Sequence, residues 1–356
     1  MQIGLIGLPQ AGKKTLLRLL TGVDMASAAP DRHGAVPGIC PVRDPRIDRL
    51  VGLYHPQKTT PATIQYLLLP DLTNDSAKNQ AFFSALLGVD ALAIVVRAFA
   101  DDTVFHVHGS VDAMRDVEAV QAELLLNDLL FIEKRLERLA KESLKKGGTE
   151  REQEQALYRR LQTHLNDNHP LRTLALAPQD QKLLTSAPLL TRKACLIVLN
   201  VGESDLRDTR LADEAARRFT GQSVAVVRLS AKIEGELAQL EPAEQQAFMQ
   251  ELGIAEPAIA GLTRVSYDAL GLISYFTVGP DEVRAWTIRR GALAPEAGGA
   301  IHSDIERGFI RAELIKYDDL LSLGSEQAVA AAGKAYLKGK DYLVEDGDIL
   351  NFRFNV

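Results

Sequence analysis

The chain has 356 residues, of which 46% are hydrophobic and 25% charged, so its length and composition predict a globular protein of two or three domains. Its net charge of −6 argues against gross electrostatic attachment to nucleic acid, and we expect no DNA partner. It has no run of 18 apolar residues, no basic signal region at the start and two cysteines without metal or disulfide spacing, so we expect a reduced, cytoplasmic protein without a membrane segment.

Short apolar runs alternate with helical segments on both sides of a long central gap. Such runs are typical of parallel strands that are buried on both faces of a sheet. After the first run we expect a helix that begins near Lys13 and stops at Gly22. The expected strands lie at residues 2–8, 62–72, 91–99, 194–201 and 223–231.

The central gap, residues 112–187, has apolar residues at helical spacing with charges between them and a break at 145–150. We interpret it as an antiparallel helical hairpin inserted into the sheet domain; a solvated helical pair that only braces the fold is the alternative. From residue 277 the pattern changes to short strands with Gly and Pro, and "EDGD" at 345–348 predicts a turn between two strands. This end of the chain is expected to form a compact β-rich module.

The stretch "GLPQAGKKT" has the G-x-x-x-x-G-K spacing of a phosphate-binding loop, and it follows a hydrophobic strand and precedes a helix. Its glycines let backbone amides turn toward phosphate oxygens, the helix start adds its dipole, and Lys13 adds a point charge. A glycine-rich turn without a ligand is the alternative. The expected phosphate-binding residues are Gly7, Pro9, Gln10, Ala11, Gly12, Lys13, Lys14 and Thr15.

This loop and further stretches resemble the YchF/Obg-like ATPase family, among them "DPRIDRLVGLYHPQKTTPATIQY", "FMQELGIAEP", "YFTVGPDEVRAWTI" and "GKDYLVEDGDILNFRFNV". The resemblance runs over the whole chain. It implies an α/β fold with a P-loop NTPase G-domain, an inserted helical coiled-coil hairpin and a C-terminal β-grasp (ubiquitin-like) TGS domain. The expected boundaries are 1–111 and 188–276 for the G-domain, 112–187 for the hairpin and 277–356 for the TGS domain.

The resemblance also implies a base-binding site that prefers ATP or ADP to GTP or GDP. GTPases usually read guanine through N-K-x-D, whereas this chain has Asn200-Val201-Gly202-Glu203, similar to the family's N-x-x-E. Glu203 is one methylene longer than Asp, which displaces the fit to guanine, and the Asn200 amide can still serve adenine. A plain strand end and helix cap is the alternative. Together with "LSAKIEG", which resembles the loop over the base, the expected residues are Asn200, Val201, Glu203, Ser230, Ala231 and Lys232.

Three departures from the family pattern meet at the Mg2+ site. Lys14 replaces the P-loop hydroxyl, Arg32 falls at the switch threonine, and Leu68 replaces the Asp of a D-x-A-G-L pattern. Mg2+ prefers oxygen ligands, so we doubt a metal site and expect Lys14 and Arg32 to take over charge neutralisation at the phosphates. Asp71, at that pattern's Gly, would repel a terminal phosphate unless it pairs with one of these cations, which favours a diphosphate ligand. Drift in a protein that no longer binds nucleotide is the alternative.

A loop resembling "VFHVHG" places the family's candidate catalytic histidine at His106, after a hydrophobic Leu72 that matches the family. A histidine can orient or deprotonate water near neutral pH. A structural histidine is the alternative. Without a metal ion His106 would have little to act with, because phosphoryl transfer relies on the ion for charge stabilisation. His108 matches no residue of the family pattern.

The resemblance implies the ribosome or ribosomal RNA as partner of an expected monomer. From residue 277 onward 10 Lys/Arg stand against 13 Asp/Glu, whereas the hairpin tip carries Lys141, Lys145, Lys146 and Arg151, which suit rRNA phosphates or a solvated helix end. The leading hypothesis is a nucleotide-binding, ribosome-associated regulatory protein with weak or absent hydrolysis. An active ATPase or GTPase with an altered metal site, and a scaffold that acts through its hairpin and TGS surfaces, are the alternatives.

Overall fold

The computed structural model describes residues 1–73, 79–143 and 148–355. Contacts divide the chain into two compact units: unit 1 comprises residues 1–38 and 65–261, and unit 2 comprises residues 39–64 and 262–356. The domain boundaries expected from the sequence stay a prediction. The contact units differ from them, because residues 39–64 group with the C-terminal part of the chain.

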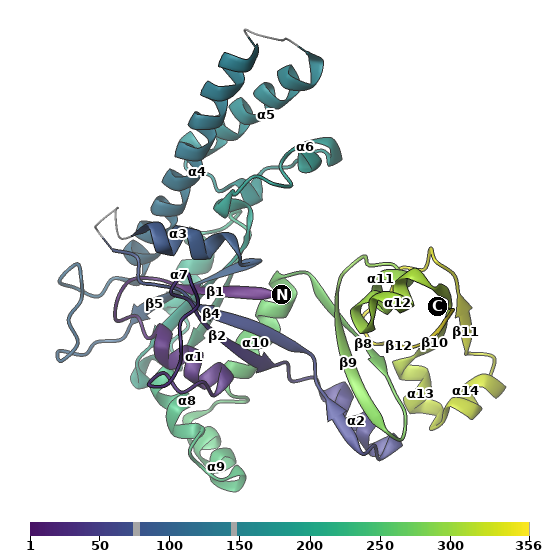
Figure 1. The fold of residues 1–356 in the computed structure, drawn as a ribbon. Helices are drawn as coiled ribbons and strands as arrows, with labels where there is room; N and C mark the ends of the chain where they lie inside the picture. The colour runs from purple at the N-terminus through teal and green to yellow at the C-terminus, as the bar shows by residue number, and fades with distance from the viewer. Residues whose placement is uncertain (74–78, 144–147, 356) are drawn as a thin grey trace. The chain divides into compact units, whose positions relative to one another are not determined.

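The first sheet contains the expected parallel strands and has the order β2-β4-β1-β5-β6-β7. Figure 1 labels β1, β2, β4 and β5 of this sheet. β1 pairs in parallel with β4 and β5, and β6 pairs in parallel with β5 and β7. Nearly every residue of β5 and β6 is buried, as expected for central strands covered on both faces. The strands are β1 (Gln2–Ile6), β2 (Val36–Pro41), β4 (Thr63–Leu68), β5 (Ala91–Ala98), β6 (Ala194–Val201) and β7 (Val224–Leu229).

β2 was missing from the sequence interpretation. It carries Pro37 and Pro41, and prolines within a run argue against a strand because they cannot donate to the ladder. β2 lies at the edge of the sheet, where only one side needs a partner. Its burial alternates strictly between buried and exposed residues, so one face of this edge strand joins the core.

Helices around this sheet follow from local capping signals. α1 (Lys13–Thr21) stops at Gly22 as predicted, with Gly22 at φ +70° and its N–H donating to the Arg18 carbonyl. One continuous core against the sheet includes Phe82 of α3 (Asn79–Leu87), Val117 of α4 (Ala113–Ser143) and Ala215 of α7 (Arg210–Arg218). The helices that follow α7 along the chain, up to the second sheet, are α8 (Ala231–Leu237), α9 (Pro242–Leu252) and α10 (Ala258–Ala269).

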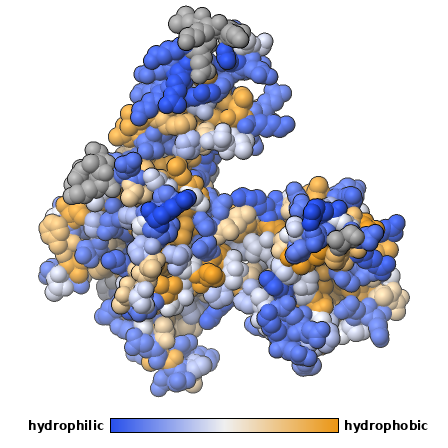
Figure 2. Space-filling model, in the orientation of Figure 1, coloured by the Kyte–Doolittle hydropathy of each residue, from blue (hydrophilic) through white to orange (hydrophobic). Residues whose placement is uncertain are grey.

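The expected helical pair is present as α4 (Ala113–Ser143) and α5 (Thr149–Asn166), with α6 (Pro178–Leu183) following it (Figure 1). The pair has a small core of its own around Ile132, Leu157 and Leu161. Its remaining visible surface is largely hydrophilic (Figure 2). In the described parts of the chain, no helix is long and apolar enough to cross a membrane. Residues 144–147, which include Lys145 and Lys146, lie outside the described residues.

The second sheet belongs to unit 2 and has the order β11-β10-β12-β8-β9-β3. Its ladders are antiparallel at β8–β9, β10–β12 and β10–β11 and parallel at β12–β8 and β3–β9. The strands are β3 (Lys58–Thr60), β8 (Leu272–Thr277), β9 (Glu282–Arg289), β10 (Phe309–Lys316), β11 (Tyr336–Lys338) and β12 (Asp348–Phe354). The helices of this unit are α2 (Pro45–Tyr54), α11 (Ala294–Ile301), α12 (Ser303–Arg307), α13 (Tyr317–Leu323) and α14 (Glu326–Ala331).

The turn between two strands that "EDGD" predicts is followed directly by a strand but not directly preceded by one. The turn leads into β12, but Leu343 before it forms an isolated bridge to Leu293 instead of belonging to a strand. Asp348 is buried and accepts hydrogen bonds from the Glu345 N–H at 2.9 Å and the Tyr342 hydroxyl at 2.7 Å. This turn is therefore fixed by side-chain contacts rather than by a second strand.

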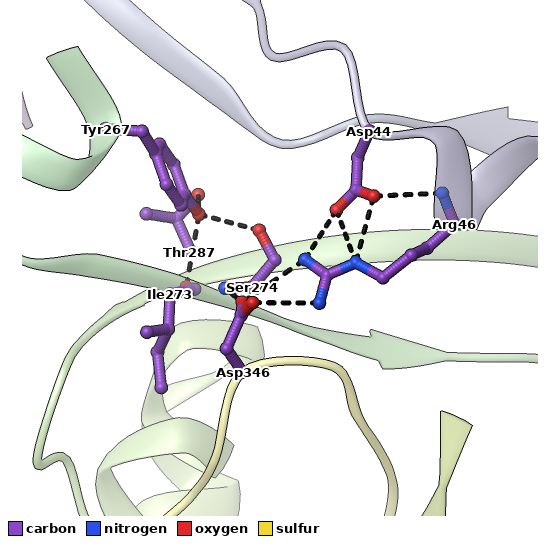
Figure 3. A network of polar contacts seen from close by, with 7 residues as sticks. All are labelled: Asp44, Arg46, Tyr267, Ile273, Ser274, Thr287 and Asp346. Atoms are coloured by element: carbon purple, nitrogen blue, oxygen red, sulfur yellow. Dashed lines mark hydrogen bonds and ion pairs between the residues drawn. The ribbon is translucent and has the colours of Figure 1, made fainter. Parts of the chain in front are cut away.

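A network around Arg46 joins α2 to the second sheet (Figure 3). The guanidinium contacts Asp44 at 2.7 Å and Asp346 at 2.9 Å, although Asp346 is separated from it by 300 residues. Asp346 also accepts from the Ser274 N–H at 2.9 Å, and Arg46 lies 5.1 Å from the centre of the Phe276 ring. These contacts explain why residues 39–64 group with unit 2.

Replacing Arg46 by alanine should destabilise unit 2 by about 2 kcal/mol, because Asp44, with a side chain only 11% exposed, loses its cation. Differential scanning calorimetry would measure the shift of the unfolding transition. Arg210→Ala is the matched control: Arg210 makes the same contact with Asp208, two residues before it, but its side chain is 90% exposed. Equal melting curves for the two variants would contradict a stabilising role of the network.

Candidate functional site

The loop between β1 and α1 has a backbone that only glycine fits at two positions. Gly7 has φ +142°, and a Cβ there would lie 2.2 Å from the Val95 carbonyl oxygen. Gly12 has φ +95°, and a Cβ there would lie 2.3 Å from Nδ2 of Asn200. The loop therefore turns tightly over β5 and β6 before α1 begins at Lys13, as the phosphate-loop spacing indicates.

Lys13 is buried under this loop, with its side chain only 4% exposed. Its ammonium donates to the carbonyls of Gly7 at 2.8 Å and Leu8 at 2.6 Å, and it contacts Oδ1 of Asp71 at 2.8 Å. Burial lowers the pKa of Lys13 below its ordinary value, and the Asp71 carboxylate opposes that shift. All three ammonium donors have acceptors within the chain.

The contact between Lys13 and Asp71 corrects one expectation. From the sequence, Asp71 was expected to repel a terminal phosphate unless it paired with Lys14 or Arg32, the cations that depart from the family pattern. Lys14 is instead exposed on α1, and Arg32 is exposed before β2, where its Nε donates to Nε2 of His33 at 3.0 Å. The expectation failed because a buried ammonium gains more from a carboxylate than an exposed one does.

A pocket of about 1,010 Å³ opens at the carboxyl ends of β5 and β6. Ligands of parallel α/β sheets bind at this edge. It is lined by Gly12, Thr15, Phe99, Ala100, Asp101, Asn200, Val201, Gly202, Glu203, Ser204, Asp205, Leu206, Arg207, Ser230, Ala231, Lys232 and Leu252. All six expected base-binding residues are in this lining, together with two residues of the phosphate loop.

Asn200 holds two walls of the pocket together. Its Nδ2 donates to the Ala11 carbonyl at 3.1 Å, and its Oδ1 accepts from the Ala231 N–H at 3.0 Å. The side chain is 4% exposed, so both contacts lie out of water. Asn200 therefore ties the phosphate loop to the start of α8, and its assignment as a direct contact to the base stays a prediction.

Two further features of the expected base loop are informative. The hydroxyl of Ser230 is buried and has no hydrogen-bond partner among the described residues, although Ser230 lines the pocket. Buried polar groups are usually satisfied, so this hydroxyl is suited to a bound ligand. Glu203 and Lys232 face each other at 3.6 Å, and both side chains are more than half exposed. Their pairing places opposite charges at the mouth of the pocket.

The sequence analysis missed the wall made by Phe99, Ala100 and Asp101, which follows β5. Arg97 shapes this segment, because its guanidinium donates to the carbonyls of Phe99 at 3.2 Å and Asp101 at 2.9 Å. Arg97 is 3% exposed at the end of an apolar strand. A lone arginine in "ALAIVVRAF" was the signal available in the sequence, because a buried guanidinium must be held by nearby acceptors.

His106 lies outside the pocket lining and has partners on both ring nitrogens. Its Nδ1 accepts from the His108 N–H at 3.2 Å, so Nε2 carries the proton and donates to Asp116 at 2.8 Å. Asp116 is buried and also accepts from Arg115. This arrangement is that of a histidine held in one orientation, and its catalytic role stays a prediction.

Comparison with known proteins covers nearly the whole chain. It is 40% identical to the ribosome-binding ATPase YchF of Bacillus subtilis over 99% of both chains, and 36% identical to the ribosome-binding ATPase YchF of Escherichia coli O157:H7 over 99% of both. The chain belongs to the YchF/Obg-like ATPase family. The structure of the Schizosaccharomyces pombe YchF GTPase superposes with a TM-score of 0.88 at 31% identity, covering 99% of this chain and 97% of that one.

Membership of the YchF/Obg-like family confirms the α/β fold class, with its P-loop G-domain, helical insert and C-terminal module. Residues 272–355 match the YchF-GTPase C-terminal family, described as a protein of unknown function (DUF933). That match begins at β8, which the sequence analysis left with the G-domain. β8 pairs with β9 and β12, so the match includes every strand of the second sheet except β3.

Asn200→Ala should destabilise the protein by about 2 kcal/mol, because it leaves the Ala11 carbonyl and the Ala231 N–H buried without partners. Thermal and urea unfolding would measure the loss. Asn351→Ala is the control, since the exposed Asn351 amide contacts the exposed side of Glu313. If Asn200→Ala melts with the wild type, the two loops do not depend on this amide.

Proposed function

We propose that the chain is a nucleotide-binding regulatory protein that prefers adenine to guanine nucleotides, associates with the ribosome and hydrolyses nucleotide weakly or not at all. The observation that carries the proposal is the pocket of about 1,010 Å³ between the phosphate loop and the loops after β5, β6 and β7. Its volume suits a nucleotide, and the buried Ser230 hydroxyl gives it an unused polar group. Gly12 and Thr15 bring the start of α1, a favourable place for phosphate, to one end of it.

The base preference rests on Glu203. An Asp at this position accepts from the two donor groups of guanine, and the added methylene of Glu moves the carboxylate out of that register. Lys232 at 3.6 Å also competes for the Glu203 carboxylate. Because Asn200 is engaged with the backbone on both sides, adenine would be bound mainly by loop backbone and by Ser230.

We propose that the side chains around the phosphate loop supply no Mg2+ site, because Mg2+ takes hard oxygen ligands in octahedral geometry. The exposed ammonium of Lys14 stands where the family pattern has a hydroxyl, and Leu68 is a buried apolar side chain. Asp71 supplies a carboxylate, but its Oδ1 is bound to Lys13. We therefore propose that phosphates are bound by backbone amides and cations.

Weak hydrolysis follows from the same side chains. Phosphoryl transfer needs charge stabilisation at the terminal phosphate, and the one buried ammonium of the loop is already paired with Asp71. His106 has no free ring nitrogen for a water molecule, because Asp116 and the His108 N–H occupy both. The protein would therefore bind nucleotide and change its nucleotide state by exchange rather than by hydrolysis.

The proposal that the chain associates with the ribosome rests on its relatives, because both relatives compared above are named ribosome-binding ATPases. In this chain the described basic residues at the end of the hairpin are Lys141, which is exposed, and Arg151, which is half-buried. They flank residues 144–147. An rRNA backbone is the phosphate-rich surface that such a tip would meet.

Isothermal titration calorimetry with ATP, ADP, GTP and GDP, in Mg2+ and then in EDTA, tests the nucleotide proposal. We expect adenine nucleotides to bind in both conditions, and more tightly than guanine nucleotides. A ligand present at 100 times its Kd should also raise the free energy of unfolding by about 2.7 kcal/mol.

Two other results would overturn the proposal. Binding that disappears in EDTA, with steady phosphate release in Mg2+, would support an active ATPase or GTPase with an altered metal site. Absence of binding in every condition, with unchanged melting curves, would support a scaffold that acts through its surfaces.

Charge reversal at the hairpin end tests the ribosome proposal. The double variant Lys141→Glu and Arg151→Glu should cosediment less with ribosomes, and the binding that remains should depend less on salt, because phosphate contacts are lost. The double variant Arg159→Glu and Lys182→Glu is the matched control, since both residues are exposed on α5 and α6 away from that end. Equal losses in the two variants would show a general charge effect instead of a tip contact.

A further inference from the structure

The Asp71 carboxylate reaches the phosphate loop because two neighbouring strands end side by side. β1 pairs with β4 in parallel, with Leu5 opposite Leu68, and the Leu69 N–H donates to the Leu5 carbonyl at 3.2 Å. The chain leaves β1 into Gly7 and leaves β4 toward Asp71. The carboxyl ends of parallel strands meet at one edge of a sheet, so this carboxylate lies beside the loop by topology.

The backbone around Asp71 is held in place. Pro70 fixes its own φ just before it, and Leu72 just after it is 4% exposed in the core. Leu69 is 2% exposed in the same core. Asp71 thus lies between two residues packed in the core, with its carboxylate within reach of Lys13.

The ion pair is asymmetric in its exposure to water. The Lys13 side chain is 4% exposed and that of Asp71 is 47% exposed. The ammonium is held from inside by the Gly7 and Leu8 carbonyls, and Asp71 is its acceptor on the solvent side. A terminal phosphate oxygen that uses the lysine of such a loop would have to approach from that same side.

We propose that Asp71 is a specificity-determining residue whose carboxylate holds Lys13 in place of a terminal phosphate oxygen, so that the site takes nucleoside diphosphates in preference to triphosphates. The inference rests on the proposed function, because it concerns the phosphates of the nucleotide that is proposed to bind there. It adds the class of ligand and the residue that selects it.

Two physical reasons support the selection. A third phosphate would bring further negative charge against the Asp71 carboxylate, and like charges a few ångströms apart repel. The carboxylate is also tethered, so it competes for Lys13 at a high effective concentration without losing translational freedom. A triphosphate must displace it, and the displaced carboxylate remains beside the ligand.

A diphosphate meets a smaller obstacle, because it lacks the third phosphate that would bring the most charge against Asp71. Gly12 and Thr15 line the pocket, whereas neither Lys13 nor Asp71 is among its lining residues. Phosphates bound at the start of α1 can therefore use backbone amides and the Thr15 hydroxyl while the ion pair stays intact. A nucleotide can therefore bind without displacing Asp71 from Lys13, as long as its phosphates do not need the Lys13 ammonium.

Calorimetric titration with ADP and ATP, in EDTA, of the wild type and Asp71→Asn tests the inference. Asparagine keeps the shape and an oxygen acceptor for Lys13 but removes the charge. We expect the wild type to bind ADP more tightly than ATP, and Asp71→Asn to shift the ratio of the two affinities toward ATP by about tenfold, a moderate value for one like-charge contact at a partly solvated site. Asp167→Asn, at the C-cap of α5, removes the same charge elsewhere and should leave the ratio unchanged.

The outcomes separate this inference from the proposed function. Equal affinities for ADP and ATP in the wild type, or an unchanged ratio in Asp71→Asn, would overturn the inference and leave nucleotide binding standing. No binding by the wild type together with ATP binding by Asp71→Asn would support Asp71 as the competitor and overturn the proposed function of the native chain. No binding by either protein would overturn both. If Asp71→Asn does not fold, as judged by its melting curve, Asp71→Gly replaces it in the same titration.

Discussion

Lys13 is an ammonium group taken almost entirely out of water at the start of α1, and such a group is tolerated only when its donors are satisfied. In a loop built to cradle phosphate, the ligand can supply the last acceptor. Here the chain supplies it, through Asp71. The folded loop is therefore complete without a ligand, and whatever binds must either leave this ion pair intact or compete with it. The proposed ligand class and the proposed loss of hydrolysis both derive from that constraint.

The pocket depends on a second constraint, the close approach of three loops. Gly12 has no room for a Cβ because the Asn200 amide lies against it, and the same amide reaches both Ala11 and Ala231. The phosphate loop, the end of β6 and the start of α8 are thus fixed by one side chain. Arg97 fixes the third wall, because its guanidinium donates to the carbonyls of Phe99 and Asp101 after β5. The residues that shape the pocket are therefore partly different from those that would touch a ligand, which is why motif reading found one set more readily.

What the sequence could predict follows the range of the interactions. Parallel strands, the stop of α1 at Gly22 and the helical pair depend on local apolar patterns and caps, and they are present. The edge strand β2 was not predicted, because its prolines argue against a strand. The pairing of β3 with β9 joins residues 58–60 to residues 282–284, and no local sequence pattern predicts a contact over that separation. The Arg46–Asp346 contact is of the same kind. At the site, the residues that the motifs predicted for the base line one pocket with Gly12 and Thr15 of the phosphate loop, and their roles stay predictions. The partner of Asp71 depended on the burial of Lys13, which no motif indicates.

The departures from the family pattern around the phosphate loop add more positive than negative charge, and their charges lie in different surroundings. Lys14 and Arg32 add two cations where the family pattern has neutral hydroxyls, and Asp71 adds one anion where it has a glycine. The exposed cations remain in solvent, whereas the anion neutralises the buried lysine. A backbone cradle with its helix dipole persists under these changes because it depends on Gly7 and Gly12, not on the exchanged side chains. In the proposed function, binding and hydrolysis therefore depend on separate parts of the site, so that binding persists where the groups required for hydrolysis have changed.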